Sequence, residues 1–231
     1  MNFKKYYRNN ITYVTKIEDR LKLVIRHVLN LNPNNILDIG CGNGLLINEL
    51  LKQGYKGKCY GTDVYVSKSV GNYEYKVSDI TDGLPYSSLK FDCVILGEVV
   101  EHIPNTDNLL REIYRVLRKD GYLIITTPNL VCWFNRIIVP LGIQPLFTET
   151  SSEIKLGRIW PSLGQGKKSE GHLKIFTHRS LQEILEYVGF KVISKQGLLF
   201  YFPFPLSMVD KIFVNFLPFS SGLLYVAKKN I

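Results

Sequence analysis

Three alternate glycines after a short apolar stretch limit what this chain can fold into more than any other feature. Residues 35–39 (Asn-Ile-Leu-Asp-Ile) precede Gly40, Gly42 and Gly44, and a helix-prone stretch at 45–52 follows them. This pattern predicts a strand, a tight turn and a helix. Glycines let the backbone adopt positive φ and approach a ligand without a Cβ in the way, and a helix start offers unpaired N–H groups. The sequence therefore predicts a ligand-binding turn.

The rest of the chain repeats the alternation of strand and helix. Further elements are predicted as strands at 57–63, 73–80, 91–96, 122–127, 191–194 and 223–227, an amphipathic helix at 15–31, and a helix that starts at 104–107 and ends at 119–121. Apolar strands that alternate with helices indicate a parallel sheet with both faces covered. We therefore predict an α/β fold.

Acidic residues stand at the ends of four predicted strands. They are Asp38, Asp63, Asp79 and Glu98. Ligands of open α/β sheets bind at the carboxyl edge, where these side chains meet. An acid after the second strand can accept hydrogen bonds from both hydroxyls of a ribose, so Asp63 is the predicted ribose ligand.

The composition of the chain limits the number of domains and the class of protein. With 231 residues and 45% apolar content, the chain can bury one substantial core, so we predict one domain over 1–231. The four cysteines lack C-x-x-C spacing, which argues against a disulfide framework or a zinc site, and the N-terminus lacks an apolar leader. These features favour a cytoplasmic protein. The formal charge of +9 fits an anionic partner or, equally, a basic proteome.

Several motifs in register resemble one family, the class I S-adenosylmethionine-dependent methyltransferases, in the small-molecule (type 11-like) branch. The motifs are residues 36–44, 61–64, 79–85, 91–103 and 115–121, with further ones at 171–177 and 188–190. The resemblance covers about 35–129 and resumes at 171–195. It implies a Rossmann-like, seven-stranded, mostly parallel sheet with helices on both faces and an antiparallel last strand.

The resemblance also implies a cofactor, S-adenosyl-L-methionine, and a set of residues that bind it. Gly40, Cys41 and Gly42 would contact its methionine end, Asp63 the ribose, Asp79 and Ile80 the adenine, and Glu98 and Val99 the floor beneath the sulfonium. Asp38, Gly44 and Val64 complete the predicted cofactor-binding set.

Methyl transfer from a sulfonium is an in-line displacement, so alignment of the two reactants in a dry pocket matters most. For a hydroxyl acceptor, His102, His172 or Glu98 could accept the proton. Each histidine could equally have a structural role. We see no set of metal ligands in the sequence and predict metal-independent O-methylation of a small acceptor that is partly apolar or linked to a glycan or lipid.

The residues after the fourth strand argue against nucleic-acid acceptors. Base and glutamine N-methyltransferases resemble one another in an Asn/Asp-Pro-Pro-Tyr/Phe run, whereas this chain has Gly-Glu-Val-Val at 97–100. A Pro-Cys pair for attack on cytosine is missing there too.

Three segments add to the predicted core. They are an N-terminal helix or lid (1–34, with Phe3, Tyr6 and Tyr7), a cap insertion (130–170) and a Phe/Pro-rich apolar loop (198–220). We predict that Trp133 of the cap and the aromatic residues of 200–219 bind the apolar acceptor. The alternatives are core packing, a homodimer interface or contact with a membrane surface; prolines and a charged pair argue against a spanning helix.

Two other classes of protein share parts of this pattern. A nicotinamide-linked oxidoreductase would have the glycine turn and the ribose acid, but its third glycine is expected one residue after Gly44. A non-catalytic cofactor-binding or scaffold protein would keep the sheet without turnover. Binding tests with both cofactors, followed by an activity test, separate the three.

Overall fold

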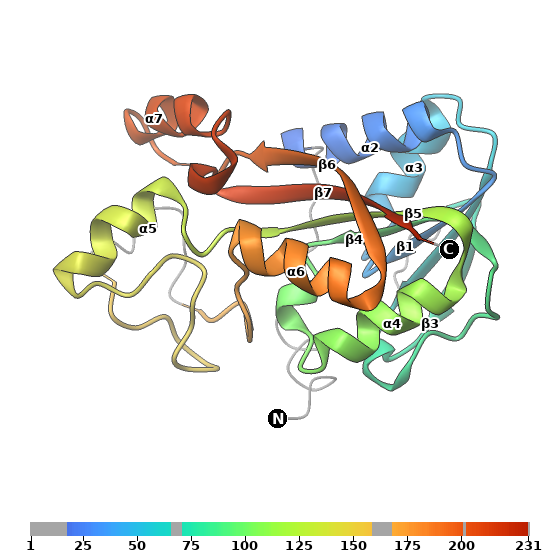
Figure 1. The fold of residues 1–231 in the computed structure, drawn as a ribbon, viewed down its shortest axis with the longest axis horizontal. Coiled ribbons are helices and arrows are strands. Elements are labelled where there is room, and N and C mark those ends of the chain that lie inside the picture. Colours follow the sequence, from blue (N-terminus) through green and yellow to red (C-terminus); the bar gives the residue numbers. More distant parts are fainter. Residues whose placement is uncertain (1–17, 66–70, 159–167, 201, 231) are drawn as a thin grey trace.

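A seven-stranded sheet forms the centre of the molecule, in the order β3-β2-β1-β4-β5-β7-β6 (Figure 1). The computed structural model describes residues 18–65, 71–158, 168–200 and 202–230. Its strands are β1 (Asn35–Ile39), β2 (Lys58–Asp63), β3 (Glu74–Val77), β4 (Phe91–Gly97), β5 (Leu117–Pro128), β6 (Phe190–Leu198) and β7 (Gly222–Lys229).

The five strands β1 to β5 run parallel to one another. Strand β7 pairs antiparallel with both β5 and β6, so β6 points the same way as β5. The predicted α/β fold with a reversed last strand is confirmed. Parallel neighbours bring the ends of β1, β2 and β4 to one edge, which is where the acidic residues were expected to meet.

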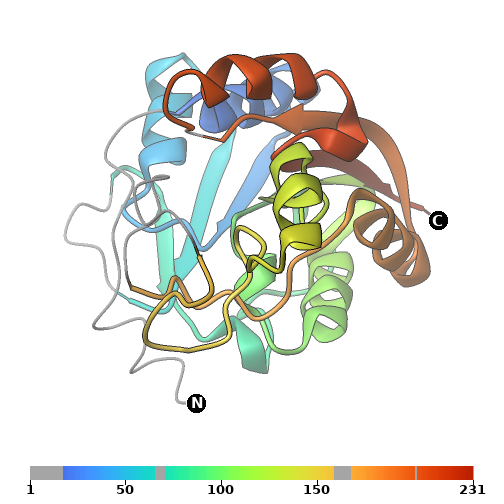
Figure 2. The same ribbon diagram turned by 90° about the vertical axis from the view of Figure 1, so that its left-hand side faces the viewer.

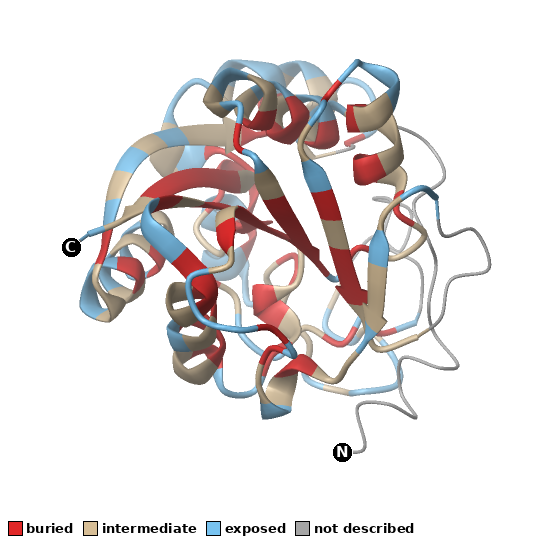
Figure 3. Cartoon of the chain, turned by 90° about the vertical axis from the view of Figure 1, so that its right-hand side faces the viewer, coloured by how far each residue is buried: buried red, intermediate tan, exposed pale blue. Residues whose placement is uncertain are grey.

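Helices cover both faces of the sheet. The helices α2 (Asp19–Leu31) and α3 (Leu45–Lys52) lie on one face, and α4 (Thr106–Val116) and α6 (His178–Val188) lie on the other (Figure 1). Successive strand residues point to opposite faces. In β1, Ile36 packs in the α2–α3 cluster, whereas Leu37 and Ile39 pack in the α4–α6 cluster. The central strands β1, β4 and β7 are accordingly mostly buried, whereas the edge strands β3 and β6 are partly exposed (Figure 3).

A third apolar cluster lies at one end of the sheet, where two inserted segments meet (Figure 2). It combines α5 (Trp133–Ile138), which follows β5, with α7 (Leu206–Phe213), which precedes β7. Short 3-10 helices, η3 (Val139–Leu141) and η4 (Leu217–Phe219), follow each of them. Of the segment predicted as a loop, 198–220, the part from Leu206 to Phe213 is a helix, so the loop prediction was wrong there.

The helix α7 forms because Leu206, Val209 and Phe213 recur at helical spacing and pack against the third cluster. The prolines at 203 and 205 precede the helix, where the lack of an N–H costs nothing.

Two helices have boundaries that differ from the predicted ones. The helix α2 begins at Asp19, and the predicted lid, with Phe3, Tyr6 and Tyr7, lies outside the described residues, as do parts of the cap. The prediction that α4 ends at 119–121 was wrong. It ends at Val116, because Leu117 is fully buried and already pairs with Phe91 as part of β5.

Candidate active site

A cavity of about 1010 Å³ lies at the carboxyl ends of β1, β2 and β4. Its wall includes all but one of the residues predicted to bind the cofactor or to act in catalysis: Asp38, Gly40, Cys41, Gly42, Asp63, Val64, Asp79, Ile80, Glu98, Val99, His102 and His172. The exception is Gly44. A Cβ there would meet the Tyr73 hydroxyl at 2.1 Å, so this glycine makes room for a protein side chain.

The glycine turn is fixed to the neighbouring strand and to the floor of the cavity. The N–H groups of Gly40 and Cys41 donate to the Thr62 carbonyl at 2.8 and 3.2 Å. At Gly40 φ is +72°, and an added Cβ would lie 2.4 Å from a methyl carbon of Val99. The turn can therefore hold only glycine at this position.

Asp63 holds the same turn from the end of β2. Its Oδ2 accepts from the Gly42 N–H at 2.9 Å, and its Oδ1 accepts from the Val64 N–H at 2.7 Å. Burial raises the pKa of Asp63, and these backbone hydrogen bonds oppose the shift. Each carboxylate oxygen can accept a second hydrogen bond, which is what a ribose hydroxyl would need.

Asp79 and Ile80 lie where the chain leaves β3. The Asp79 Oδ1 accepts from the Thr81 N–H at 3.1 Å and so caps the short helix η1 (Ile80–Asp82). Ile80 is buried at the cavity wall. Asp79 and Ile80 therefore both line the cavity, and their role at the adenine stays a prediction.

Asp38 faces a cation that the sequence analysis missed. Burial and the nearby Asp63 raise the pKa of Asp38 to about 7, and the positive charge of Arg20 opposes the shift. Arg20 lies on α2, and its side chain is only 18% exposed and 3.7 Å from the Glu18 carboxylate. Arg20 also lines the cavity, so a carboxylate-bearing ligand would find a positive charge there.

The chain turns sharply after β4. Glu98 has φ of +54°, a left-handed conformation that is uncommon outside glycine, and its N–H donates to the Thr126 carbonyl at 3.1 Å. The 3-10 helix η2 (Val100–His102) follows and carries Glu101 beneath the cavity. Glu101 is fully buried, and burial together with the charge of Glu98 raises its pKa well above the ordinary value.

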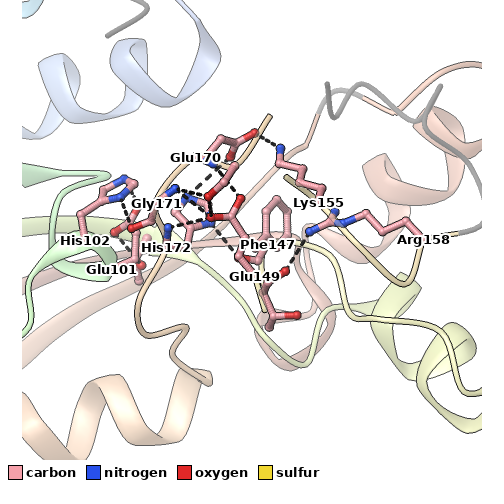
Figure 4. A network of polar contacts seen from close by, with 12 residues as sticks. Glu101, His102, Phe147, Glu149, Lys155, Arg158, Glu170, Gly171 and His172 are labelled. Carbon is pink, nitrogen blue, oxygen red and sulfur yellow. Dashed lines mark hydrogen bonds and ion pairs between the residues drawn. The ribbon is translucent and has the colours of Figure 1, made fainter. Parts of the chain in front are cut away.

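The two predicted histidines lie against each other, with ring centroids 4.8 Å apart (Figure 4). Nδ1 of His102 is 3.1 Å from the Gly171 carbonyl, and Nδ1 of His172 is 2.7 Å from the Phe147 carbonyl. A carbonyl can only accept, so each ring has its proton on Nδ1. Burial and the neighbouring His172 lower the pKa of His102 to about 4.

One carboxylate holds the loop that carries His172. Glu149 accepts hydrogen bonds from the N–H groups of residues 170, 171 and 172, at 2.7 to 3.1 Å (Figure 4). Its pKa is lowered; burial would raise it, but the hydrogen bonds outweigh that effect. Glu149 therefore positions His172 beside His102.

The apolar wall of the cavity differs from the predicted one. Phe147, Phe200 and Phe202 line the cavity, but Trp133 does not. Trp133 is 5% exposed and stacks on Phe213 at 5.7 Å within the third cluster. The prediction that Trp133 contacts the acceptor was therefore wrong, and Trp133 is part of the core of the cap.

Sequence reasoning missed several residues of the site. The spacing of Glu98, Glu101 and His102 was a signal for Glu101, because the turn after β4 brings all three to the cavity. Arg20 could have been noted as the first cation of α2. Phe147 and Glu149 gave no signal, since their contacts with residues 169–172 cross a long stretch of chain.

The glycine turn, the acids at the strand ends and their shared cavity define an α/β protein that binds a nucleoside-containing cofactor at the carboxyl edge of its sheet. Residues 12–195 match the family described as methyltransferase domain. This chain therefore belongs to the S-adenosylmethionine-dependent methyltransferases of class I. Among the described residues, no helix is both long and apolar enough to cross a membrane.

Curated relatives are named for methyl transfer in quinone biosynthesis. The demethylmenaquinone methyltransferase of Lactobacillus johnsonii is 31% identical in an alignment of 181 residues that covers 70% of each chain. The mitochondrial ubiquinone biosynthesis O-methyltransferase of Candida albicans is 28% identical over 177 residues, 67% of this chain and 53% of that one. The chain thus spans about half the length of the mitochondrial ubiquinone enzymes it matches.

Solved structures share the fold. A methyltransferase from Methanosarcina mazei has a TM-score of 0.61 at 20% identity and covers 90% of this chain and 97% of its own. The 1,6-didemethyltoxoflavin-N1-methyltransferase of Burkholderia thailandensis, solved with 1,6-didemethyltoxoflavin and S-adenosylhomocysteine, has a TM-score of 0.57 at 17% identity and covers 92% and 78%. At these identities the likeness concerns the fold alone.

Proposed function

We propose that this protein transfers a methyl group from S-adenosylmethionine to a hydroxyl oxygen of a small, partly apolar acceptor. One observation carries the proposal: a single cavity joins the glycine turn and Asp63 to an apolar wall of Phe147, Phe200 and Phe202, with His102 and His172 also on its wall. Drug-sized ligands occupy pockets of about 300–1,000 Å³, so a cavity of about 1010 Å³ has room for a cofactor beside a small acceptor.

The residues present fit the cofactor. Gly40 and Gly42 both line the cavity with positive φ, so the turn brings its backbone to the cavity wall without side chains of its own there. Asp63 would hold the ribose, Asp79 and Ile80 the adenine, and Arg20 the carboxylate of the methionine end. When bound, S-adenosylmethionine supplies a methyl group activated by the positive sulfur.

The chain's own residues then align the acceptor and take up its proton. Holding the two reactants in line can supply roughly 7 to 11 kcal/mol of the barrier. With the proton of His172 on Nδ1, its Nε2 can accept one from a hydroxyl. His102 has the same tautomer, and Glu98 offers a carboxylate on the cavity wall.

The names of the curated relatives support a quinone-type acceptor. Two of them are ubiquinone and demethylmenaquinone methyltransferases. A quinol ring carries hydroxyls and an apolar body, and the aromatic wall of the cavity suits such a molecule.

We further propose that the outer face of α7 lies against an anionic lipid surface from which the acceptor enters. Phe204, Met208, Ile212 and Phe216 recur every four residues, and each is more than half exposed. Between residues 202 and 220 the one acid, Asp210, is fully buried, whereas Lys211 is exposed on the same helix and also lines the cavity. An apolar face bordered by a cation is typical of helices that bind the surface of a membrane.

The test of methyl transfer uses the purified chain with S-adenosylmethionine labelled in its methyl group. Quinols with short apolar tails are offered beside glycans and oligonucleotides, and products are identified by mass. Label on a quinol oxygen supports the proposal. Label on a nitrogen or on nucleic acid, or binding of a nicotinamide dinucleotide in place of the sulfur cofactor, contradicts it. Cofactor binding without transfer to any acceptor would favour the scaffold alternative.

A further inference from the structure

We propose that Lys155 of the cap binds an anionic group of the methyl acceptor, either a carboxylate or a phosphate, and that the Glu170 carboxylate holds this position when the acceptor is absent. The inference rests on the proposed function and deepens it, because it adds a charged group to the small, partly apolar acceptor. Lys155, Glu170 and His172 all line the cavity. The proposed anion site therefore lies in the part of the cavity where the acceptor hydroxyl is expected.

The ammonium group of Lys155 is enclosed by the protein. Only 3% of its side chain is exposed, and its Nζ forms an ion pair with Oε1 of Glu170 (Figure 4). The neighbouring Ile154 pairs with Lys168 in an antiparallel bridge, which fixes the backbone on both sides of the ion pair. A charge that is buried in this way requires a counter-charge. Lys155 therefore needs an anion next to it.

The present counter-charge of Lys155 is a carboxylate that can return to water. The side chain of Glu170 is 49% exposed, and its Oε2 lies 3.6 Å from Nε2 of His172, beyond the usual length of a hydrogen bond. An exposed carboxylate gains little from one ion pair, whereas a buried cation loses much when it is left alone. An anion from a ligand can therefore replace Glu170 and keep Lys155 paired.

The other nearby acid, Glu149, is already occupied. Its oxygens accept from the Ser169 hydroxyl at 2.6 Å and from three backbone N–H groups of the loop before α6. Of the lysine, arginine and acidic side chains in the described part of the cap, those that line the cavity are Lys155, Lys168 and Glu170. Two cations and one acid leave this wall positively charged, and more so when Glu170 turns to solvent.

A third cation, Arg158, adds to this charge. Its Nη2 donates to the Thr148 carbonyl at 2.9 Å, but Nε and Nη1 are buried and have no partner among the described residues (Figure 4). Burial lowers the pKa of Arg158, and the charges of Glu149 and Glu170 oppose the shift. Arg158 and Lys155 thus share the carboxylate of Glu170. Because opposite charges attract strongly where water is largely excluded, a further anion is favoured there.

The position of Glu170 also indicates the size of the acceptor. One carboxylate reaches from Lys155 toward His172, so an acceptor no longer than a substituted aromatic ring can place a hydroxyl at Nε2 of His172 and an anion at Lys155. Phe147 lines the cavity beside them and suits the ring. The anion takes no part in the bond changes of methyl transfer, but it orients the hydroxyl. The acceptor class is therefore an apolar hydroxy compound with a carboxylate or phosphate group.

The test compares small probes that differ in one charge. The anions are 4-hydroxyphenylacetate and 4-hydroxyphenyl phosphate, and 4-hydroxyphenylacetamide is the neutral counterpart of the first. Each is titrated into the full chain saturated with S-adenosylhomocysteine, and binding is followed by ligand-observed NMR. Wild-type protein should bind at least one of the anions about tenfold more tightly than the amide, as expected for a charge-assisted hydrogen bond. The tighter of the two anions then tells whether the acceptor carries a carboxylate or a phosphate.

Variants of the ion pair separate an anion site from a structural contact. Lys155→Met removes the charge and should abolish the preference for the anion, whereas Lys155→Arg should retain it. Glu170→Gln removes the competing charge and should tighten anion binding without changing that of the amide. Lys174→Met changes an exposed lysine of the loop before α6 outside the cavity wall, so it is the matched control and should bind like the wild type. If Lys155→Met lowers the melting temperature but keeps the preference, the ion pair is structural and the proposal is wrong.

Calorimetry with S-adenosylmethionine and the methyl-transfer assay, on the same samples, separate this proposal from the proposed function. Variants that bind the cofactor like wild type are folded. Wild-type protein that methylates a hydroxyl but binds the amide as tightly as both anions would overturn the anion site and leave the proposed function intact. A preference for the anion that depends on Lys155, without methyl transfer to any hydroxyl, would support the anion site and overturn the proposed function alone.

Discussion

The indole N–H of Trp133 donates a hydrogen bond of 2.8 Å to the carboxylate of Asp210. The bond joins α5 to α7, two segments inserted at different points of the chain. Asp210 is fully buried and also accepts from the Phe200 N–H at 2.7 Å and from the Ser221 hydroxyl. One carboxylate thus connects both insertions to the start of β7 and to the aromatic wall of the cavity.

Asp210→Ala should lower the free energy of unfolding by about 2–4 kcal/mol, because it leaves buried donors without an acceptor. Urea denaturation measures the change. Asp120→Ala, which breaks an exposed ion pair with Lys228, is the matched control and should cost no more than about 1 kcal/mol. Equal effects of the two substitutions would show that the buried carboxylate does not hold the insertions together.

Asp63→Ala should weaken S-adenosylmethionine binding by roughly 1 to 3 kcal/mol, or about 5- to 150-fold. The substitution removes charge-assisted acceptors for the ribose and also the bond that holds the Gly42 N–H. Calorimetry gives the affinity, and Asp82→Ala, an exposed acid of η1, is the control. If Asp63→Ala binds the cofactor as tightly as the control does, Asp63 only shapes the turn.

Asp38 should make the protein less stable as the pH rises. Its pKa is about 7 in the folded protein against an ordinary 3.8, so the unfolded chain releases the proton first. The folded state holds more protons between about pH 4 and pH 7, and the free energy of unfolding therefore falls across that window. At 1.36 kcal/mol per pH unit, the loss is at most about 4 kcal/mol above pH 7.

The substitution Asp38→Asn isolates this effect, since it removes the titrating group and keeps the size of the side chain. Relative to wild type, the variant should gain stability between pH 5 and pH 8, as measured by urea denaturation at both values. A difference between the two proteins that does not change with pH would mean that Asp38 ionises normally in the folded state.

The core of the fold could be predicted because each strand carries a local signal. Apolar runs, glycine turns and helical periodicity are all read within about ten residues, and the parallel pairing of β1, β2 and β4 then places the acids at one edge. The helix α7 was missed because it is short, because two prolines stand just before it, and because a charged pair lies within it. The hydrophobicity of a residue also does not reveal which way its side chain points. Trp133 was therefore predicted in the cavity wall, although it lies in the core of the cap.

The chemistry of the site was harder to predict than its position. Glu149 and His172 are joined by a hydrogen bond between the insertion and the loop before α6. No local sequence pattern predicts such a contact. The pairing of His102 with His172 likewise depends on how the loop after the cap lies beside η2, where the N–H groups of Leu173 and Lys174 donate to the Glu101 carbonyl. Parallel strand ends are a general rule of α/β sheets, whereas the contacts of an insertion are particular to each chain.

The exposed face of α7 should bind vesicles that contain anionic lipid. Ile212 is 62% exposed and Met208 is 58% exposed on this face, beside Lys211. Ile212→Glu places a negative charge in an apolar face and should reduce binding to vesicles of phosphatidylcholine with phosphatidylglycerol at least fivefold in a sedimentation assay, because both the apolar and the electrostatic attraction fall. Ile193→Glu, at a similarly exposed apolar position on β6, is the matched control and should bind as wild type does. Added salt should weaken wild-type binding through screening of the Lys211 charge. If Ile212→Glu leaves vesicle binding unchanged but converts a dimer into a monomer in sedimentation velocity, the face is an interface between two copies of the chain and the lipid proposal is wrong.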